Sequence, residues 1–355
     1  MLRLLAMNKL VDFERPTNAL YSGLPLRHIT ELPIYGVPVR YESNSAAAIA
    51  TIEDAFGAWR VLRKDPELVA AEGVRVRLIV HDGDEGAARH APTIWRLPDA
   101  DRLFVRTPGS LGVVDMGRGD AVAYITPALL ADRAHAQYGM LGCMTLPLVE
   151  VQGRYPVHAG MVGRGGVAIL LAGPSNTGKS TLLFEAHRCG LRALADDCAH
   201  IQLRPTFRVW GECPEQVYLP AEAKQHFPEL RDVPTVLASG IEKVLVRFRT
   251  GVSSDPATPP VTTRVGVCLL ARTGGRAALA TASADEVKAF LRKGLDMQRL
   301  MCGVGFDDAL VRLSADGGWK LSLSDDPADA LPFIDEMLTV LERTARAPAL
   351  CSSAN

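Results

Sequence analysis

The sequence lacks three features that would settle its class at once: an excess of one charge, a long apolar run and paired cysteines. Lysine and arginine number 39 against 40 aspartate and glutamate residues, for a net charge of -1. This balance lacks the basic footprint of nucleic-acid binding. The longest apolar run, residues 167–172, falls far below the roughly 20 residues of a membrane helix. We therefore expect neither nucleic acid nor a membrane as a partner.

The seven cysteines form no C-x-x-C pair, which argues against a zinc site. Their odd number and irregular spacing also argue against a disulfide framework and favour a reducing compartment. The first ten residues, MLRLLAMNKL, are too short and too often interrupted by polar residues for a signal sequence. These observations predict a cytoplasmic, untargeted protein.

With 355 residues, 48% apolar and 22% charged, the chain has the composition of a globular protein and the length of two domains. We expect an N-terminal α+β domain over residues 1–145, whose role is either acceptor recognition or subunit pairing. A second α/β domain is expected over 146–346, followed by a disordered tail at 347–355.

Periodicity predicts the main elements of both halves. In the first half, strands are expected at 35–40, 74–80, 102–106 and 113–125, and helices at 49–62 and 128–146. In the second half, helices are expected at 179–189, 285–300 and 328–343, and a loop at 250–260. Strands there are expected at 151–157, 166–172, 191–196, 199–203, 244–248, 265–270 and 310–313.

The central motif is GPSNTGKS, residues 173–180, followed by Thr181. It matches the phosphate-binding pattern G-x-x-x-x-G-K-[ST] without a mismatch. A buried strand before it and a helix after it provide the strand–loop–helix context that this pattern requires. Gly173 and Gly178 allow the backbone to approach phosphates closely, and successive N–H groups meet the negative charge at a helix N-terminus. Lys179 reaches the β- and γ-phosphates, and the Ser180 hydroxyl is a ligand of Mg²⁺.

Two adjacent carboxylates, Asp196 and Asp197, end the next predicted strand. The end of that strand is expected beside the phosphate loop, where open α/β sheets bind ligands. One carboxylate can help to hold Mg²⁺, and the other can accept a proton from an attacking hydroxyl. His158 precedes the loop strand, and the hairpin of 151–172 is expected to carry it to the same end of the sheet.

In the order of these features, the stretch from His158 to Ile201 resembles the HPr kinase/phosphorylase family. The resemblance is clear over residues 150–205 and extends weakly to about 340. It implies a fold related to phosphoenolpyruvate carboxykinase and ATP-dependent phosphorylation of a hydroxyl, often a serine. Relatives often assemble as oligomers, so it also implies a homo-oligomer.

The resemblance also implies roles for individual residues. ATP phosphates are placed on the loop, and Mg²⁺ is placed on Ser180 and one of the two aspartates, which we take to be Asp197. Asp196 matches the general base, His158 matches the active-site histidine, and Lys179 neutralises charge on the transferred group. The loop residues expected to hold the nucleotide are Gly173, Ser175, Asn176, Thr177, Gly178, Lys179, Ser180 and Thr181.

The sequence departs from the family in two places. Sensor members carry Ser-Gly-x-Gly inside the loop, whereas here Ser175 is followed by Asn176. The later signature Glu-x-Arg-Gly-Leu-Gly is missing, and Glu212 or Glu215 is the candidate for its carboxylate. These departures argue against HPr as the acceptor and favour a peptide or a small molecule.

The leading hypothesis is therefore a kinase in which Asp196 orients or deprotonates an acceptor hydroxyl that attacks the γ-phosphate of Mg-ATP. Arg247, Arg249 and Arg264 are candidates for an additional positive contact. Three alternatives stay open: a nucleotide-binding regulatory or scaffold module without transfer, a motor or switch NTPase, and the reverse phosphorylase or carboxykinase-like chemistry.

Overall fold

The structure, a computed structural model, describes residues 23–83, 92–96, 101–133, 135–212, 216–238, 241–248, 259–293 and 305–346. These residues form a mixed α/β protein with two compact units. The first unit holds residues 1–32, 38–57 and 71–148, and the second holds 33–37, 58–70 and 149–355. The chain therefore does not divide at one point, because two short segments of the first half belong to the second unit.

The first unit is built on a seven-stranded sheet of order β1-β2-β3-β7-β6-β5-β4. Its strands are β1 (His28–Ile34), β2 (Val37–Ser43), β3 (Val74–Val80), β4 (Thr93–Arg96), β5 (Arg102–Thr107), β6 (Ser110–Asp115) and β7 (Asp120–Ile125). The strand predicted at 74–80 is confirmed with the same bounds. β3 runs parallel to β2 and to β7, and β4 to β7 form an antiparallel meander.

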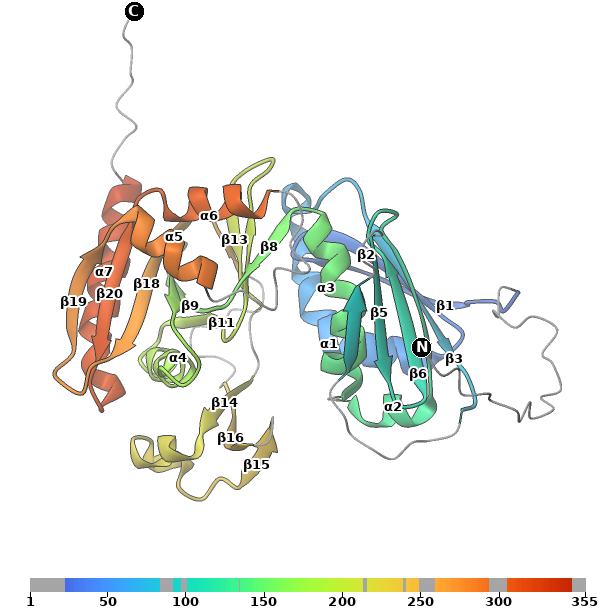
Figure 1. Cartoon of the computed structure of the whole chain (residues 1–355), viewed down its shortest axis with the longest axis horizontal. Helices are drawn as coiled ribbons and strands as arrows, with labels where there is room; N and C mark the ends of the chain where they lie inside the picture. Colours follow the sequence, from blue (N-terminus) through green and yellow to red (C-terminus); the bar gives the residue numbers. More distant parts are fainter. Residues whose placement is uncertain are drawn as a thin grey trace, which may run out of the picture. The chain divides into compact units, whose positions relative to one another are not determined.

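Helices α1 (Ala46–Phe56) and α3 (Gly142–Val151) lie against this sheet (Figure 1). Tyr41 of β2 stacks on Phe56 and shares a hydrogen bond with Thr145 at 2.9 Å, which fixes both helices on one face. The single helix predicted over 128–146 is instead α2 (Pro127–Ala131), a π-helical turn (His135–Leu141) and α3.

The second unit is built on a six-stranded sheet of order β11-β9-β10-β18-β20-β19. Its strands are β9 (Ala159–Arg164), β10 (Val167–Ala172), β11 (Arg192–Ala195), β18 (Arg264–Arg272), β19 (Ala278–Ala282) and β20 (Gly318–Leu323). β10 is parallel to β18, and β18 is parallel to β20, while β9 is antiparallel to both β10 and β11. Sequence reasoning did not identify β9, which occupies the expected turn between two strands.

Every residue of β10 is buried, because helices cover both faces of its sheet. Ala168 and Leu170 pack in a core with α5 (Ala284–Lys293) and α6 (Phe306–Ser314). Ile169 and Leu171 point the other way, toward α4 (Lys179–Arg188) and α7 (Leu331–Arg346). A central strand with no polar face is what burial on both sides requires.

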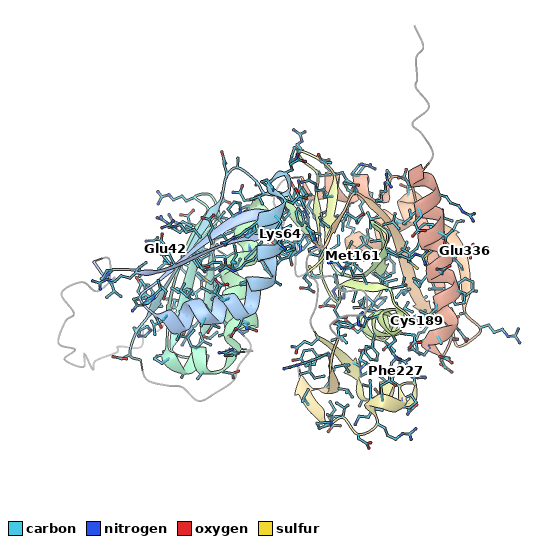
Figure 2. All side chains as sticks on the ribbon, turned by 180° about the vertical axis from the view of Figure 1, so that it is seen from behind. Glu42, Lys64, Met161, Cys189, Phe227 and Glu336 are labelled. Carbon is cyan, nitrogen blue, oxygen red and sulfur yellow. The ribbon has the colours of Figure 1, made fainter. Side chains whose placement is uncertain are left out.

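Figure 2 shows this layering through the side chains, with Met161 inside the unit and Glu336 on the outer side of α7. The strand predicted at 310–313 is wrong, since these residues belong to α6. Phe306, Ala309, Leu310 and Leu313 are buried at intervals of three and four, the spacing of one helical face. A run of four residues rich in apolar side chains is too short to distinguish a strand from a helix.

Two smaller sheets complete the second unit. One has the order β17-β13-β12-β8 and contains β8 (Arg154–Val157), β12 (Ala199–Gln202), β13 (Arg208–Trp210) and β17 (Val261–Thr262). The other has the order β14-β16-β15 and contains β14 (Gln216–Pro220), β15 (Thr235–Ala238) and β16 (Ile241–Arg247). Most of the loop predicted at 250–260, the end of the helix predicted at 285–300 and the tail at 347–355 lie outside the described residues.

Candidate functional site

The loop between β10 and α4 adopts a tight conformation that its sequence makes possible. Gly178 has φ +111° and Asn176 has φ +63°, in the left-handed region that glycine and asparagine tolerate best. The Thr177 hydroxyl donates a hydrogen bond to the Pro174 carbonyl at 2.7 Å. The first N–H groups of α4 have no partner within the helix, so the loop ends at a set of donors suited to an anion.

Lys179 is buried at the start of α4 and lies across the loop. Its ammonium donates to the carbonyls of Gly173 at 2.8 Å and Pro174 at 3.1 Å. Burial lowers its pKa, while the charges of Asp197 and Asp196 act in the opposite direction. The ammonium is thus held against the loop by neutral carbonyls, with two carboxylates nearby.

The other loop residues that are expected to bind the nucleotide differ in their exposure to solvent. Ser175 and Asn176 are exposed at the tip, whereas Thr177 and Thr181 are buried. Gly173 is also buried, and a Cβ there would come within 3.3 Å of Leu270 and Thr177. The loop therefore has a packed base and an accessible tip.

The antiparallel strand β9 explains how His158 reaches this loop. Ala159 pairs with Ala172, so the start of β9 lies at the end of β10. β11 also pairs with β9, with Ala195 opposite Met161. The residues before β9 and after β10 and β11 therefore meet at one edge of the sheet, where the chain places His158, the phosphate loop and the aspartate pair.

Asp196 lies against the loop. Its carboxylate lies near the Ser180 hydroxyl, and its Oδ1 is buried without a hydrogen-bond partner among the described residues. Burial raises its pKa to about 6, while the nearby Ser180 hydroxyl acts in the opposite direction. Gly160 allows this approach, because a Cβ there would lie 3.2 Å from the Asp196 carbonyl.

Asp197, the next residue, pairs with His158. Its Oδ1 lies 3.3 Å from Nδ1 of His158, and the two side chains are 75% and 25% exposed respectively. Burial lowers the pKa of His158, Asp197 opposes this effect, and the charge of Lys179 adds to it. Asp196 is thus next to Ser180, whereas Asp197 is next to the histidine.

Glu212, one of two candidates for a further carboxylate, joins this edge, while Glu215 lies outside the described residues. The Glu212 carboxylate accepts hydrogen bonds from the backbone amides of Asp196 and Asp197. Although the residue is exposed to solvent, desolvation by the surrounding protein and the charges of both aspartates raise its pKa. Three carboxyl groups consequently share one small region.

A second group of titratable residues lies deeper in the same unit. The rings of Tyr35 and His200 are 4.1 Å apart, and Arg154 Nε donates to the Tyr35 carbonyl at 2.7 Å. Burial raises the pKa of Glu150 to about 8 and lowers that of His200 to about 3. Among the described residues, neither ring nitrogen of His200 nor Oε2 of Glu150 has a hydrogen-bond partner.

The structure places one of the arginines proposed from the sequence away from this edge. Arg264 begins β18 opposite Val167, at the far end of β10 from the loop. Arg247 ends β16 and is exposed, and Arg249 lies outside the described residues. Sequence reasoning missed Arg272 at the end of β18, whose Nε donates to the Thr177 carbonyl at 3.2 Å.

Within the described ranges, no group of three or more histidine, cysteine, aspartate or glutamate side chains is arranged to hold a metal ion. A nucleotide-bound Mg²⁺ does not need such a group, since it takes one or two protein ligands and completes its shell with phosphates and water. Over the same ranges, no helix has the length and apolar character needed to cross a membrane.

Comparisons with known proteins give limited information. No protein-family model matches the chain, and no curated protein matches it. Among solved structures, the HPr(Ser) kinase/phosphatase from Coxiella burnetii matches at 14% identity over 54% of this chain and 91% of that one, with a TM-score of 0.28. A likeness of this size establishes neither the fold family nor the activity, which have to be argued from the site.

Proposed function

We propose that the chain is an ATP- and Mg²⁺-dependent kinase with an HPr kinase-like P-loop domain, acting on a serine-like hydroxyl of a peptide, protein or small molecule. The observation that carries this proposal is the common edge of β9, β10 and β11. There the loop of residues 173–181, the neighbouring side chains of Ser180 and Asp196, and the His158–Asp197 pair lie together.

Ser180 and Asp196 have the chemistry to hold magnesium. Mg²⁺ prefers hard oxygen ligands, and these residues offer a hydroxyl and a carboxylate that are close neighbours. The buried, unpartnered Oδ1 of Asp196 is a costly arrangement that a cation would relieve. When bound, the ion would neutralise charge on the phosphate oxygens. We assign the Mg²⁺ role to Ser180 and Asp196 in preference to the expected Asp197.

His158 and Asp197 have the arrangement of a proton-accepting pair. With its pKa lowered by burial, His158 is neutral near pH 7. A proton on Nδ1 is then held by Asp197, and Nε2 becomes the nitrogen that accepts a proton. The acceptor hydroxyl would lose its proton to this nitrogen as its oxygen attacks the γ-phosphorus and the bond to the β–γ bridging oxygen breaks.

Transfer from γ-labelled ATP tests the proposal. The protein would be incubated with Mg²⁺ and pools of amino acids, sugars, peptides and proteins, with Lys179→Ala as the control. Label on one acceptor, lost in the variant, is the expected result. Tight ATP binding without transfer to any pool, including proteins, would instead indicate a regulatory module.

Two matched variants separate the roles of the aspartates. Asp196→Asn is expected to raise the Mg²⁺ concentration needed for ATP binding. Asp197→Asn is expected to leave that requirement unchanged and to slow transfer by about 10²–10⁴-fold, the usual contribution of general base catalysis. The reverse pattern would restore Asp196 as the base and Asp197 as the metal ligand.

A further inference from the structure

Arg272 is placed by sheet topology at the mouth of the phosphate loop. β18 is the parallel neighbour of β10, and Leu269 pairs with Ala172, the last residue of β10. The carboxyl ends of parallel neighbours lie at the same edge of a sheet, which is where such sheets bind their ligands. Three residues beyond Leu269, Arg272 therefore stands beside the loop, on the flank away from His158, since β9 lies on the other side of β10.

The contacts of Arg272 use only part of its guanidinium. Nε donates to the Thr177 carbonyl, and Nη2 lies 3.4 Å from the position that a Cβ on Gly178 would take. Nη1 lies 3.9 Å from Oδ1 of Asp325, beyond hydrogen-bonding distance. The arginine side chain is 48% exposed and that of Asp325 is 97% exposed. The outer nitrogens are thus available to a ligand that approaches the loop.

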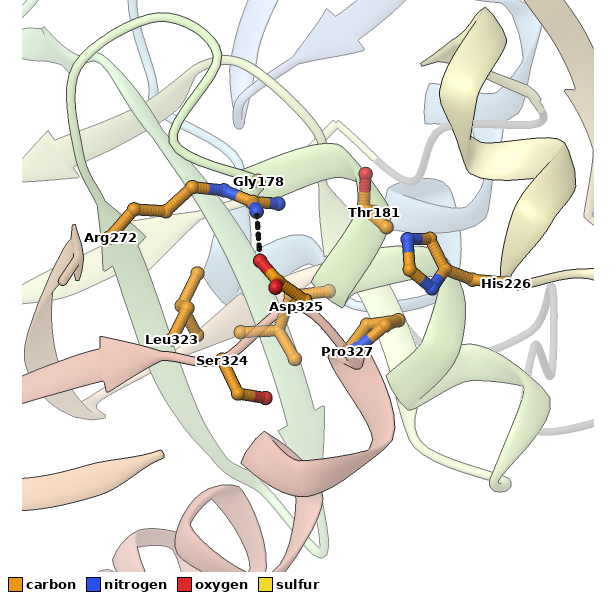
Figure 3. Close-up of a pocket in the computed structure, with 9 residues that line it drawn as sticks. Gly178, Thr181, His226, Arg272, Leu323, Ser324, Asp325 and Pro327 are labelled. Atoms are coloured by element: carbon orange, nitrogen blue, oxygen red, sulfur yellow. Dashed lines mark ion pairs between the residues drawn. The ribbon is translucent and has the colours of Figure 1, made fainter. Parts of the chain in front are cut away.

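Figure 3 shows the Arg272 side chain at a small hollow beside the first turn of α4. The lining residues are Gly178, Thr181, Leu182, His226, Arg272, Leu323, Ser324, Asp325 and Pro327. Asp325 is the single carboxylate among them, and it stands opposite the Arg272 guanidinium. The planar fork of donors on Arg272 suits phosphate oxygens.

We infer that Arg272 is a phosphate-binding residue of the nucleotide site and that Asp325 competes with the bound polyphosphate for its guanidinium. The inference rests on the proposed function, because it assumes that the loop receives a polyphosphate. Without a ligand, the guanidinium stays anchored on Thr177 and loosely paired with Asp325. With a ligand, the Thr177 contact keeps the arginine in place while its outer nitrogens exchange the carboxylate for phosphate oxygens.

The test compares the affinities of the full chain for ATP and for inorganic tripolyphosphate by calorimetry at low salt. The variants are Arg272→Gln, which keeps an N–H donor for the Thr177 carbonyl but removes the charge, and Asp325→Asn. Arg276→Gln is the matched control, because Arg276 is exposed on the same segment and does not line the hollow. Thermal melts check that each variant is folded.

Arg272→Gln is expected to weaken both ligands about tenfold or more, as loss of a charge-assisted hydrogen bond does. Asp325→Asn is expected to strengthen both by up to about fivefold, the scale of an exposed ion pair, and to have no effect in the Arg272→Gln background. This dependence on Arg272 is a readout that a merely structural role in shaping the loop would not produce.

Several outcomes would overturn the inference. If Arg272→Gln binds like Arg276→Gln while Lys179→Ala loses ATP, the inference fails and the proposed function stands. If Arg272→Gln loses ATP but keeps tripolyphosphate, the residue contacts the nucleoside and not the phosphates. An equal effect of Asp325→Asn with and without Arg272 would show that Asp325 does not compete for the Arg272 guanidinium. Failure of the unmodified chain to bind either ligand would overturn both proposals.

Discussion

The two compact units of the molecule treat charge in different ways. In the first unit, Arg75 and Arg77 both pair with Asp120 across neighbouring strands, and Arg102 pairs with Asp115, with the arginine side chains 35–50% exposed. In the second unit, burial shifts the pKa values of Asp196, Glu150 and His200.

This difference separates polar groups that are solvated by water from polar groups whose only possible partners are protein atoms. Exposed ion pairs contribute little to stability, commonly between about 0 and 1 kcal/mol. Buried groups without hydrogen-bond partners cost free energy, which the rest of the fold has to offset. Such groups concentrate at functional sites, so the contrast by itself directs attention to the second unit.

The largest effect on stability is expected from a substitution at Gly36, in the turn that follows Tyr35. Gly36 has φ +75°, and a Cβ there would lie 2.3 Å from the Leu68 carbonyl and 2.9 Å from the Trp210 ring. Gly36→Ala should therefore lower the free energy of unfolding by about 3 kcal/mol or more, through backbone strain and overpacking together. Urea denaturation measures the loss.

Gly153→Ala is the matched control for this turn. Gly153 has φ +76° but no neighbouring atom within 4 Å, so the substitution introduces the same backbone strain without the clash. Its expected cost is about 1–2 kcal/mol. Equal losses in the two variants would show that the packing of Gly36 against Leu68 and Trp210 contributes nothing.

An intermediate effect is expected from the pH dependence of Glu150. With its pKa raised to about 8, the folded protein keeps a proton that the unfolded chain loses near pH 4.5. Stability should therefore fall as pH rises through this window and level off above pH 8. Between pH 6.5 and 8 the fall is about 2 kcal/mol, at about 1.4 kcal/mol per unit.

Glu150→Gln should abolish this slope without a loss of stability at pH 7, because the amide preserves the shape and carries no charge. Denaturation curves at pH 6.5, 7, 7.5 and 8 provide the measurement. His200 acts with the opposite sign, since its pKa of about 3 makes stability rise with pH only up to about 6.5, below the range measured. An unchanged slope in Glu150→Gln would place the titration on another group.

The smallest effect is expected in the first unit. Asp120→Asn removes the carboxylate from two ion pairs, with Arg75 and Arg77, yet should change the free energy of unfolding by no more than about 1 kcal/mol. It should leave ATP binding unchanged, and raising the salt concentration should reduce the difference from the unmodified chain. A loss comparable to that of Gly36→Ala would contradict the contrast between the two compact units.

Local chemistry in the sequence predicted the elements around the loop well. The strand before it, the helix after it and the stop at Gly190, where φ is +91°, all follow from short-range rules. What the sequence did not supply was pairing between distant segments. Without β9, the order of strands at the edge stayed unknown, and without the β10–β18 pairing nothing singled out Arg272, which lies 95 residues from Thr177.

The surroundings of Asp196 and Asp197 could be told apart only in three dimensions, for a related reason. Adjacent residues leaving a strand point in different directions, and only the neighbours show which carboxylate faces Ser180 and which faces His158. The identity of the acceptor, the preference for ATP and the homo-oligomer stay predictions. They depend on loops and surfaces that no local motif describes.

The turn at Tyr35 and the segment around Trp59 bear on how this chain can be taken apart and recombined. Both belong to the compact unit that holds the phosphate loop, where Tyr35 packs on His200 and on Trp59. A fragment beginning near residue 146 would carry the whole motif region and still leave Trp210, now fully buried, without part of its cover. The second half is thus no interchangeable module: a gene fusion or a domain exchange has to transfer these two stretches of the first half with it.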